Sequence, residues 1–331
     1  MKIMFPDWRH RLRVASVIAI CAAAFSLRHG AASPQAAAAP SSSLEILEVR
    51  PSFFLIAGAG ANIAVQVGED GVVIVDAGTS AGAPAVLAAI KRISPKPIRY
   101  IIDTGPDTDH VGGNEAISKA GEKLFAASTL GGGAFDTAAP IVSAQGVVRR
   151  MAGAPSGGLP TEVFNYSRKY MYLNGEAIEV LHQPAAHTDS DVLAFFRRSD
   201  VVVAGDVLDT RQFPVIDVER GGSIQGEIAA LNRLVDLAVP SVPVVTREAG
   251  TIVVPGHGHL CDQYDVVDYR DMVTIIRDRV RDLIKAGRSL TEVKAAQPAN
   301  GYMGRYGNKS SAWTTDRFIE AIYRSLAKEK S

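Results

Sequence analysis

The sequence predicts a single α+β domain that begins near residue 45. Segments typical of strands and helices follow one another in the order strands, helices, strands, helices, and no repeat or low-complexity block divides residues 45–330. The chain has 331 residues, of which 47% are hydrophobic, so it can bury a full core and is not intrinsically disordered. Its 35 Lys and Arg residues balance 35 Asp and Glu residues, which excludes a general nucleic-acid-binding protein.

The first half of the domain is expected to consist mainly of strands. Apolar segments at 45–56, 62–68 and 71–78 predict strands, and the Glu69-Asp70-Gly71 turn joins the last two as a hairpin. A helix is predicted over 84–93 because Pro84 suits a first helical position, and a strand follows at 98–103. Residues 129–165 are rich in Gly, Ala and Pro, and we expect a loop or short helices there, over one edge.

The second half repeats this order and ends in helices. Strands are predicted at 169–173, 177–182, 192–197, 201–206 and 251–256, with a helix at 224–238 before the last of them. Residues 264–286 form an amphipathic pattern that Gly287 ends, and a final helix is expected over 314–327.

Residues 1–40 have the composition of a secretory signal peptide and a short linker. A basic start precedes an uncharged run at 14–27, and small residues follow at 31–40. That run is too short to span a hydrocarbon core of about 30 Å at about 1.5 Å per helical residue. We therefore expect export to the periplasm or the medium, cleavage within 36–39, no stable membrane anchor after cleavage, and a domain over 41–331.

Histidines and aspartates collect in loops that follow the predicted strands. The segments are DTGPDTDHVGG (103–113), HQPAAHTDSD (182–191), AGD (204–206) and PGHGH (255–259). Each His or Asp alone would be explained by turn capping or packing. Together these segments indicate a metal centre, because imidazole and carboxylate are common metal ligands.

The order and spacing of these motifs resemble the metallo-β-lactamase superfamily of metallohydrolases, from residue 45 to about residue 260. VDAG at 75–78 matches the motif whose Asp, here Asp76, supports the metal site. The family's His-x-His-x-Asp-His motif falls on residues 105–110, and its isolated ligand histidine falls on His187. Its bridging aspartate falls on Asp206, and its last ligand histidine on His257.

The sequence departs from the family at the first two histidines of the central motif. Gly105 offers no side chain there, and Asp107 offers oxygen in place of nitrogen. In the family those two positions, with His187, form the first metal site. In this sequence, the first metal site would keep only His187 as a ligand, together with Asp107 if the Asp107 side chain turns inwards.

The family's second metal site is complete in this sequence. Asp109, His110 and His257 form it in the family, and Asp206 can bridge the two sites. The resemblance therefore implies one well-formed metal site beside a weakened one.

The resemblance implies a four-layer αββα sandwich with two mixed sheets and a metal ion at one edge. Zinc is the first expectation, as one ion or as two, with iron and manganese as alternatives because the carboxylates favour harder ions. The implied activity is attack of metal-activated water on a small-molecule ester, thioester, lactone or amide, with Asp109 as a ligand that also orients the water. The alternative is a non-catalytic binding protein that keeps the fold with a degenerate first site.

Several neighbouring residues have weaker expectations. Asp189 is expected to accept a hydrogen bond from His187, with turn capping as the alternative. His259 could replace His257 as a ligand, although the motif favours His257. Arg220 and the following residues precede a helix and could hold an anionic group, but capping by Ser223 is the simpler interpretation.

Overall fold

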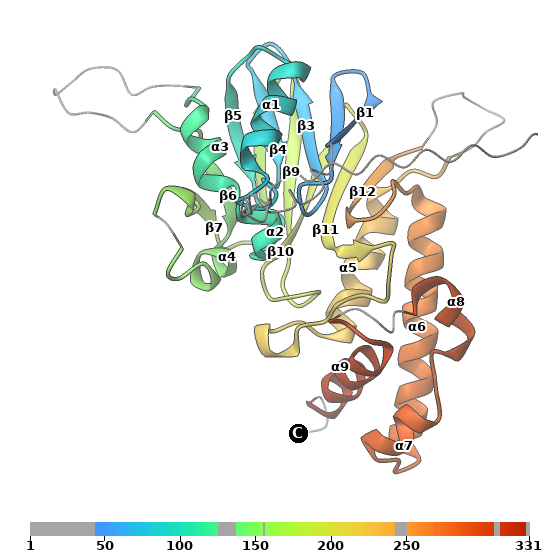
Figure 1. Cartoon of the computed structure of the whole chain (residues 1–331). Coiled ribbons are helices and arrows are strands. Elements are labelled where there is room, and N and C mark those ends of the chain that lie inside the picture. Colours follow the sequence, from blue (N-terminus) through green and yellow to red (C-terminus); the bar gives the residue numbers. More distant parts are fainter. Residues whose placement is uncertain (1–43, 125–136, 155, 242–249, 308–311, 329–331) are drawn as a thin grey trace, which may run out of the picture. The chain divides into compact units, whose positions relative to one another are not determined.

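The computed structural model describes residues 44–124, 137–154, 156–241, 250–307 and 312–328 (Figure 1). The expected signal peptide and its cleavage site lie outside the described residues. None of the helices in these ranges combines the length and apolar composition needed to cross a membrane.

The first sheet is mixed. Its strands, in both chain and spatial order, are β1 (Glu45–Arg50), β2 (Phe53–Ala57), β3 (Ile63–Val67), β4 (Val72–Val75), β5 (Ile98–Ile102), β6 (Ile141–Ala144) and β7 (Glu162–Phe164). Pairing is antiparallel from β1 to β4 and parallel from β4 to β7.

The second sheet is also mixed. It contains β8 (Arg168–Leu173), β9 (Glu176–Gln183), β10 (Asp191–Phe196), β11 (Val201–Asp209) and β12 (Ile252–His257). The spatial order is β12-β11-β10-β9-β8, and only the β11–β12 pair is parallel.

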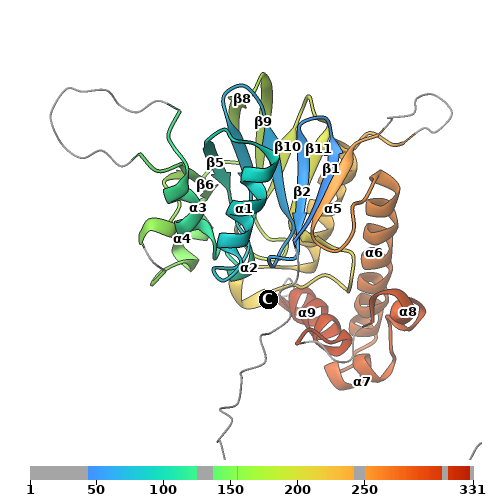
Figure 2. The same cartoon turned by 45° about the horizontal axis from the view of Figure 1, so that its top comes forward.

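Helices cover the outer faces of both sheets (Figures 1 and 2). The helices of the described residues are α1 (Ala83–Ile93), α2 (Thr108–Val111), α3 (Asn114–Ala120), α4 (Gln145–Arg150), α5 (Ile224–Leu237), α6 (Gln263–Lys285), α7 (Leu290–Ala295), α8 (Met303–Tyr306) and α9 (Thr315–Lys328); α1 and α3 pack on the first sheet, and α5, α6 and α9 pack on the second. Three-residue 3₁₀ turns occur at η1 (Ser156–Gly158), η2 (Val218–Arg220) and η3 (Asn300–Tyr302).

Three apolar clusters define four layers, which confirms the predicted αββα sandwich. One cluster joins α1 and α3 to the outer face of the first sheet. A second lies between the sheets, where Phe53 packs edge-on against Phe196 with ring centroids 4.9 Å apart. The third joins the second sheet to α5, α6 and α9. Alternate residues of a strand face opposite sides, so β4 sends Val72 and Ile74 to one cluster and Val73 and Val75 to another.

Helix caps explain where the long helices begin and end. Ser223 caps α5 by accepting a hydrogen bond from the amide of Gly226, as the simpler interpretation of that loop predicts. Asp262 and Asp265 form a capping box at the start of α6, and Gly287, at φ 77°, follows its last turn.

The segment 129–165 corrects one expectation. Residues 129–136 of this segment lie outside the described residues. The rest contains short helical elements, α4 and η1, as expected, but also β6 and β7, which extend the first sheet. These strands have only four and three residues, too short to show a strand period in a segment rich in Gly and Pro. The Gly- and Asp-rich segment after β5 likewise contains α2 and α3, and 45–56 is a hairpin of two strands.

Candidate metal centre

Strand ends bring the predicted site residues together at one edge of the sandwich. Because β4 and β5 are parallel, their carboxyl ends meet, and the same holds for β11 and β12. Asp76 follows β4, and Asp107, Asp109 and His110 follow β5 in and before α2. The other residues come from the β9–β10 loop, from β11 and from the end of β12; they are His187, Asp206 and His257.

Asp109, His110 and His257 form the first of two groups of possible metal ligands. One donor atom from each lies within 4.8 Å of the others. His257 Nε2 is 3.0 Å from Asp109 Oδ2 and 3.6 Å from Asp206 Oδ1, and His110 Nε2 is 3.2 Å from Asp206 Oδ1. Ligand atoms about 2.0–2.1 Å from one tetrahedral ion lie about 3.3 Å apart, so these separations suit a shared ion.

The orientation of His110 points to the same position. The ring is buried, and its Nδ1 is 2.8 Å from Asp76 Oδ2 and 3.1 Å from Thr104 Oγ1. Its Nε2 faces Asp206 Oδ1 at 3.2 Å but lacks the alignment of a hydrogen bond, and no other described residue offers it a partner. A buried nitrogen left in this way costs about 1–3 kcal/mol. A metal ion between His110, Asp109 and His257 would remove that cost, so the residues fit the ion that the sequence predicts.

Asp76 is held in place behind His110. Its carboxylate is fully buried and accepts hydrogen bonds of 2.8 Å from both the amide and the hydroxyl of Thr104. Its backbone has φ 65°, a left-handed conformation that costs a residue with a side chain on the order of 1 kcal/mol. Thr104 was not singled out from the sequence, although it directly follows Asp103 in the predicted loop. Gly205 lets β11 approach it, because a Cβ at 205 would lie 2.5 Å from Thr104 Oγ1.

Electrostatics keep the carboxylates of this group ionised. The hydrogen bond from His257 lowers the pKa of Asp109, and burial opposes it only in part. Burial alone would raise the pKa of Asp206, but the charges of His110, His187 and His257 hold that pKa well below its usual range. Both side chains can therefore offer anionic oxygen to a cation at neutral pH.

Asp107, His187 and Asp206 form the second group, and the polar atoms of Asp107 and His187 are already engaged. His187 Nε2 is 2.7 Å from Asp107 Oδ2, and His187 Nδ1 is 2.7 Å from the Val215 carbonyl oxygen. Burial alone would lower the pKa of His187, but its hydrogen bond to Asp107 and the charges of Asp206 and Asp191 raise that pKa to about 10.

Arg220 completes the second group and is the main residue whose position the sequence did not predict. Its Nη1 lies 2.5 Å from Asp107 Oδ1 and its Nη2 3.2 Å from Asp107 Oδ2, in a two-pronged ion pair. Burial alone would raise the pKa of Asp107, but the hydrogen bonds from His187 and Arg220 lower it to about 2. The sequence signal is the Arg-Gly-Gly-Ser segment at 220–223, which by itself indicates anion binding or helix capping and not an ion pair with Asp107.

Asp189 corrects another expectation. It was expected to accept a hydrogen bond from His187, but the Val215 carbonyl takes that place. Asp189 instead pairs with Arg150, whose Nη2 lies 2.7 Å from Asp189 Oδ2. The backbone directs the side chain of Asp189 away from the imidazole, because its amide donates to the Arg220 carbonyl at 3.0 Å.

His259 lies outside the two ligand groups, and Gly105 leaves space beside them. The exposed His259 contacts Thr210 Oγ1 at 3.1 Å through Nδ1, whereas His257 faces the cluster. A Cβ at Gly105 would lie 3.6 Å from Asp191 Oδ1, an ordinary contact, so the position has room for a side chain that this sequence does not supply.

The two groups open into one cavity of about 500 Å³. Its lining includes Gly60, Asp107, Asp109, His187, Asp206, Asp209, Arg211, Gln212, Val215, Arg220 and His257. Arg211 is paired with Asp209, with Nε 3.0 Å from Oδ1 and Nη2 3.0 Å from Oδ2. A small molecule in this cavity would lie beside both groups.

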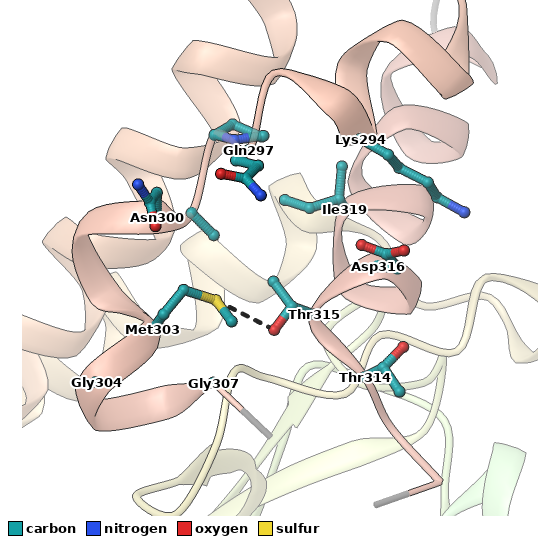
Figure 3. Close-up of a pocket in the computed structure, with 12 residues that line it drawn as sticks. Lys294, Gln297, Asn300, Met303, Gly304, Gly307, Thr314, Thr315, Asp316 and Ile319 are labelled. Carbon is teal, nitrogen blue, oxygen red and sulfur yellow. Dashed lines mark hydrogen bonds between the residues drawn. The ribbon is translucent and has the colours of Figure 1, made fainter. Parts of the chain in front are cut away.

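A larger cavity of about 900 Å³ lies among α7, α8 and α9 (Figure 3). Its lining includes Lys294, Asn300, Thr315 and Asp316, and Lys294 already pairs with Glu320 at 2.7 Å. Neither group of possible metal ligands among the described residues lies there. The chemistry therefore belongs to the smaller cavity.

Comparisons with known proteins agree with the motifs and the fold. The sequence model described as the metallo-beta-lactamase superfamily matches residues 57–257. None of the curated proteins compared matches the sequence.

Solved structures share the fold at low sequence identity. A double mutant of the sec-alkyl sulfatase PisA1, an enzyme from Pseudomonas sp., aligns with a TM-score of 0.63 at 15% identity, over 86% of this chain and 50% of that chain. This chain therefore spans half the length of that relative. A metallo-beta-lactamase from Pontibacter korlensis aligns with a TM-score of 0.54 at 18% identity, over 70% of this chain and 99% of that chain. The DIM-1 metallo-beta-lactamase aligns with a TM-score of 0.52 at 15% identity, over 70% and 97%.

Proposed function

This chain belongs to the metallo-β-lactamase superfamily, and from that premise we propose that it is a hydrolase that depends on a divalent metal ion. The ion is held by Asp109, His110 and His257, with Asp206 beside it. The substrate is a small ester, thioester, lactone or amide that enters the cavity of about 500 Å³.

One observation carries the proposal. The buried His110 Nε2 has no hydrogen-bond partner among the described residues, and Asp109 and His257 offer donor atoms around the same position. Two imidazoles with carboxylates suit zinc, while the number of carboxylates leaves iron and manganese as alternatives.

In the proposed hydrolysis, individual residues have separate roles. When bound, a divalent ion supplies Lewis acidity, which lowers the pKa of water and polarises the oxygen of a substrate carbonyl. Asp76 and Thr104 fix the ring of His110, so that its Nε2 keeps one direction. The Asp109 side chain, 37% exposed, turns one oxygen to His257 and leaves the other to orient the attacking water and accept its proton.

Metal analysis together with a substrate panel tests the proposal. The panel contains esters, thioesters, lactones and amides, including a β-lactam, and a secondary alkyl sulfate because one structural relative is a sec-alkyl sulfatase. We expect turnover of at least one class, and Asp109→Asn should lower kcat by about 100-fold or more. Asp271→Asn, an exposed change on α6, is the matched control and should leave kcat unchanged.

A non-catalytic binding protein is the alternative, and the engagement of Asp107 and His187 with one another favours it. Bound metal without turnover of any panel member, after addition of zinc, manganese or iron, would support this alternative. A protein that retains no metal would contradict the metal centre itself.

We also propose that the protein is exported. The support is the order of basic, apolar and small residues in 1–40. Sequencing of the N-terminus of the protein recovered outside the cytoplasm should begin within 36–40. A chain recovered with residues 1–40 intact would contradict export by cleavage of this segment.

A further inference from the structure

Arg220 lies where the second group of ligands would have to hold a metal ion. Its guanidinium forms an ion pair with both oxygens of Asp107, at 2.5 and 3.2 Å, and its Nη2 lies 3.4 Å from His187 Nε2. A side chain therefore contacts the same two donor groups that an ion would have to contact.

The loop around Arg220 is built to hold this position. Asp217 accepts hydrogen bonds from the Arg220 amide at 3.0 Å and from Arg220 Nε at 2.6 Å, and its own amide donates to the His187 carbonyl at 2.9 Å. A Cβ at Gly222 would lie 2.2 Å from the His187 carbonyl oxygen, so only glycine lets the loop approach this closely. Arg220 and His187 are consequently fixed to each other through backbone contacts.

The spacing of donor atoms distinguishes the two groups. His257 Nε2 lies 3.0 Å from Asp109 Oδ2 in the first group, and Asp206 Oδ1 lies 3.2 Å from His110 Nε2 and 3.6 Å from His257 Nε2, all near the value of about 3.3 Å expected for ligands of one tetrahedral ion. In the second, Asp107 Oδ2 and His187 Nε2 are 2.7 Å apart, the distance of a direct hydrogen bond. Each ring nitrogen of His187 has an oxygen acceptor opposite it, so neither nitrogen is left free for an ion in the cavity.

Charge leads to the same conclusion. Asp109 and Asp206 can balance one divalent ion in the first group. In the second, Asp107 and Asp217 are both already paired with the guanidinium of Arg220, which stays positive at any ordinary pH. A second ion would face this fixed positive charge, and Asp206, the one carboxylate of the group outside these ion pairs, also contacts His110 and His257 of the first group.

We infer that Arg220 takes the place of a second metal ion, so that the chain binds one ion and Arg220 supplies the fixed positive charge beside it. The inference rests on the proposed function only in taking Asp109, His110 and His257 to hold that ion. Arg220 lines the same cavity, so its charge would lie beside a substrate bound there.

Metal stoichiometry tests the inference without any measurement of activity. The full chain is saturated with zinc, freed of unbound metal and analysed for zinc per chain. The wild type should hold one ion and Arg220→Ala two, because this change releases Asp107 and opens space beside His187. Arg211→Ala removes another arginine of the same cavity, which contacts Asp209 and not Asp107, and should still hold one ion.

A crystal of the wild type soaked with zinc gives a second measurement that does not depend on folding of the variant. Anomalous scattering should show one peak, among Asp109, His110 and His257. Two peaks, a wild type with two ions, or an Arg220→Ala protein with no more metal than the wild type would overturn the inference. One ion in the wild type and two in the variant uphold it even if no substrate is hydrolysed, which would contradict the proposed function alone.

Discussion

The two halves of the metal centre share Asp206 and one cavity, but they use their polar atoms differently. In the half formed by Asp109, His110 and His257, a buried imidazole nitrogen has no hydrogen-bond partner among the described residues. In the half formed by Asp107 and His187, both imidazole nitrogens and both carboxylate oxygens meet partners from the chain itself. A ligand set is therefore not defined by residue types alone, because the same imidazole and carboxylate groups suit a metal in one half and a salt bridge in the other.

The difference arises from the groups that contact the two ring nitrogens of each histidine. Asp76, at the end of β4, fixes His110 through Nδ1 and leaves Nε2 facing the cluster. His187 is fixed through Nδ1 by the Val215 carbonyl, but its Nε2 is met by an aspartate that occupies a histidine position of the family motif. Asp107 also forms an ion pair with Arg220, so the polar atoms of this half contact one another.

The largest effect is expected from His110→Ala, which removes the free nitrogen of the metal half. Metal retention should be abolished, and the free energy of unfolding should fall by about 3 kcal/mol because Asp76 is left buried without its imidazole. Elemental analysis and urea denaturation measure the two effects. His259→Ala, an exposed histidine near His257, is the control and should change neither. Unaltered metal content in His110→Ala would show that the ligand assignment is wrong.

The free energy of unfolding, measured as a function of pH, tests the half formed by Asp107 and His187. Folding raises the pKa of His187 from 6.5 to about 10, so its contribution to stability is complete below pH 6.5 and is lost as the pH rises through about 10. In the metal-free wild type we expect the free energy of unfolding to fall by a few kcal/mol across this range. Denaturation at a series of pH values measures the fall.

His187→Gln serves as the comparison for this titration, because glutamine does not titrate there. The part of the fall that belongs to His187 should be absent from the variant, and His259→Gln should keep it. Parallel pH profiles for the wild type and His187→Gln would contradict the ion pair between His187 and Asp107.

The smallest effect is expected from Asp76→Asn, which weakens the support of His110 without removing a ligand. Outer partners of metal-bound histidines typically contribute about 10–100-fold to metal affinity, and we expect a loss in that range. Competition with a chromogenic chelator measures it. Asp189→Asn is the matched control, since Asp189 pairs with Arg150 and does not contact His187. Equal losses in the two variants would mean that Asp76 does not act through His110.

Much of the fold could be predicted because its strands are long enough to show their pattern. β3, β4, β9, β10 and β11 are apolar segments bounded by turns, and α6 has both an amphipathic pattern and a glycine at its end. β6 and β7 could not be predicted, because strands of four and three residues acquire their structure from the parallel neighbour β5 and from each other.

The sequence by itself determined the superfamily, the αββα architecture and the residues that the motifs carry, because strand patterns and motif spacing are local properties. The resemblance also predicts that Gly105 and Asp107 stand at two histidine positions of the family motif. Only the tertiary structure decided what those replacements mean. Arg220 and Asp107 are 113 positions apart, and no local pattern reports a salt bridge between a loop after β5 and a loop before α5. Asp189 follows His187 closely in the chain but pairs with Arg150, because the direction of a side chain depends on the backbone contacts of the folded loop.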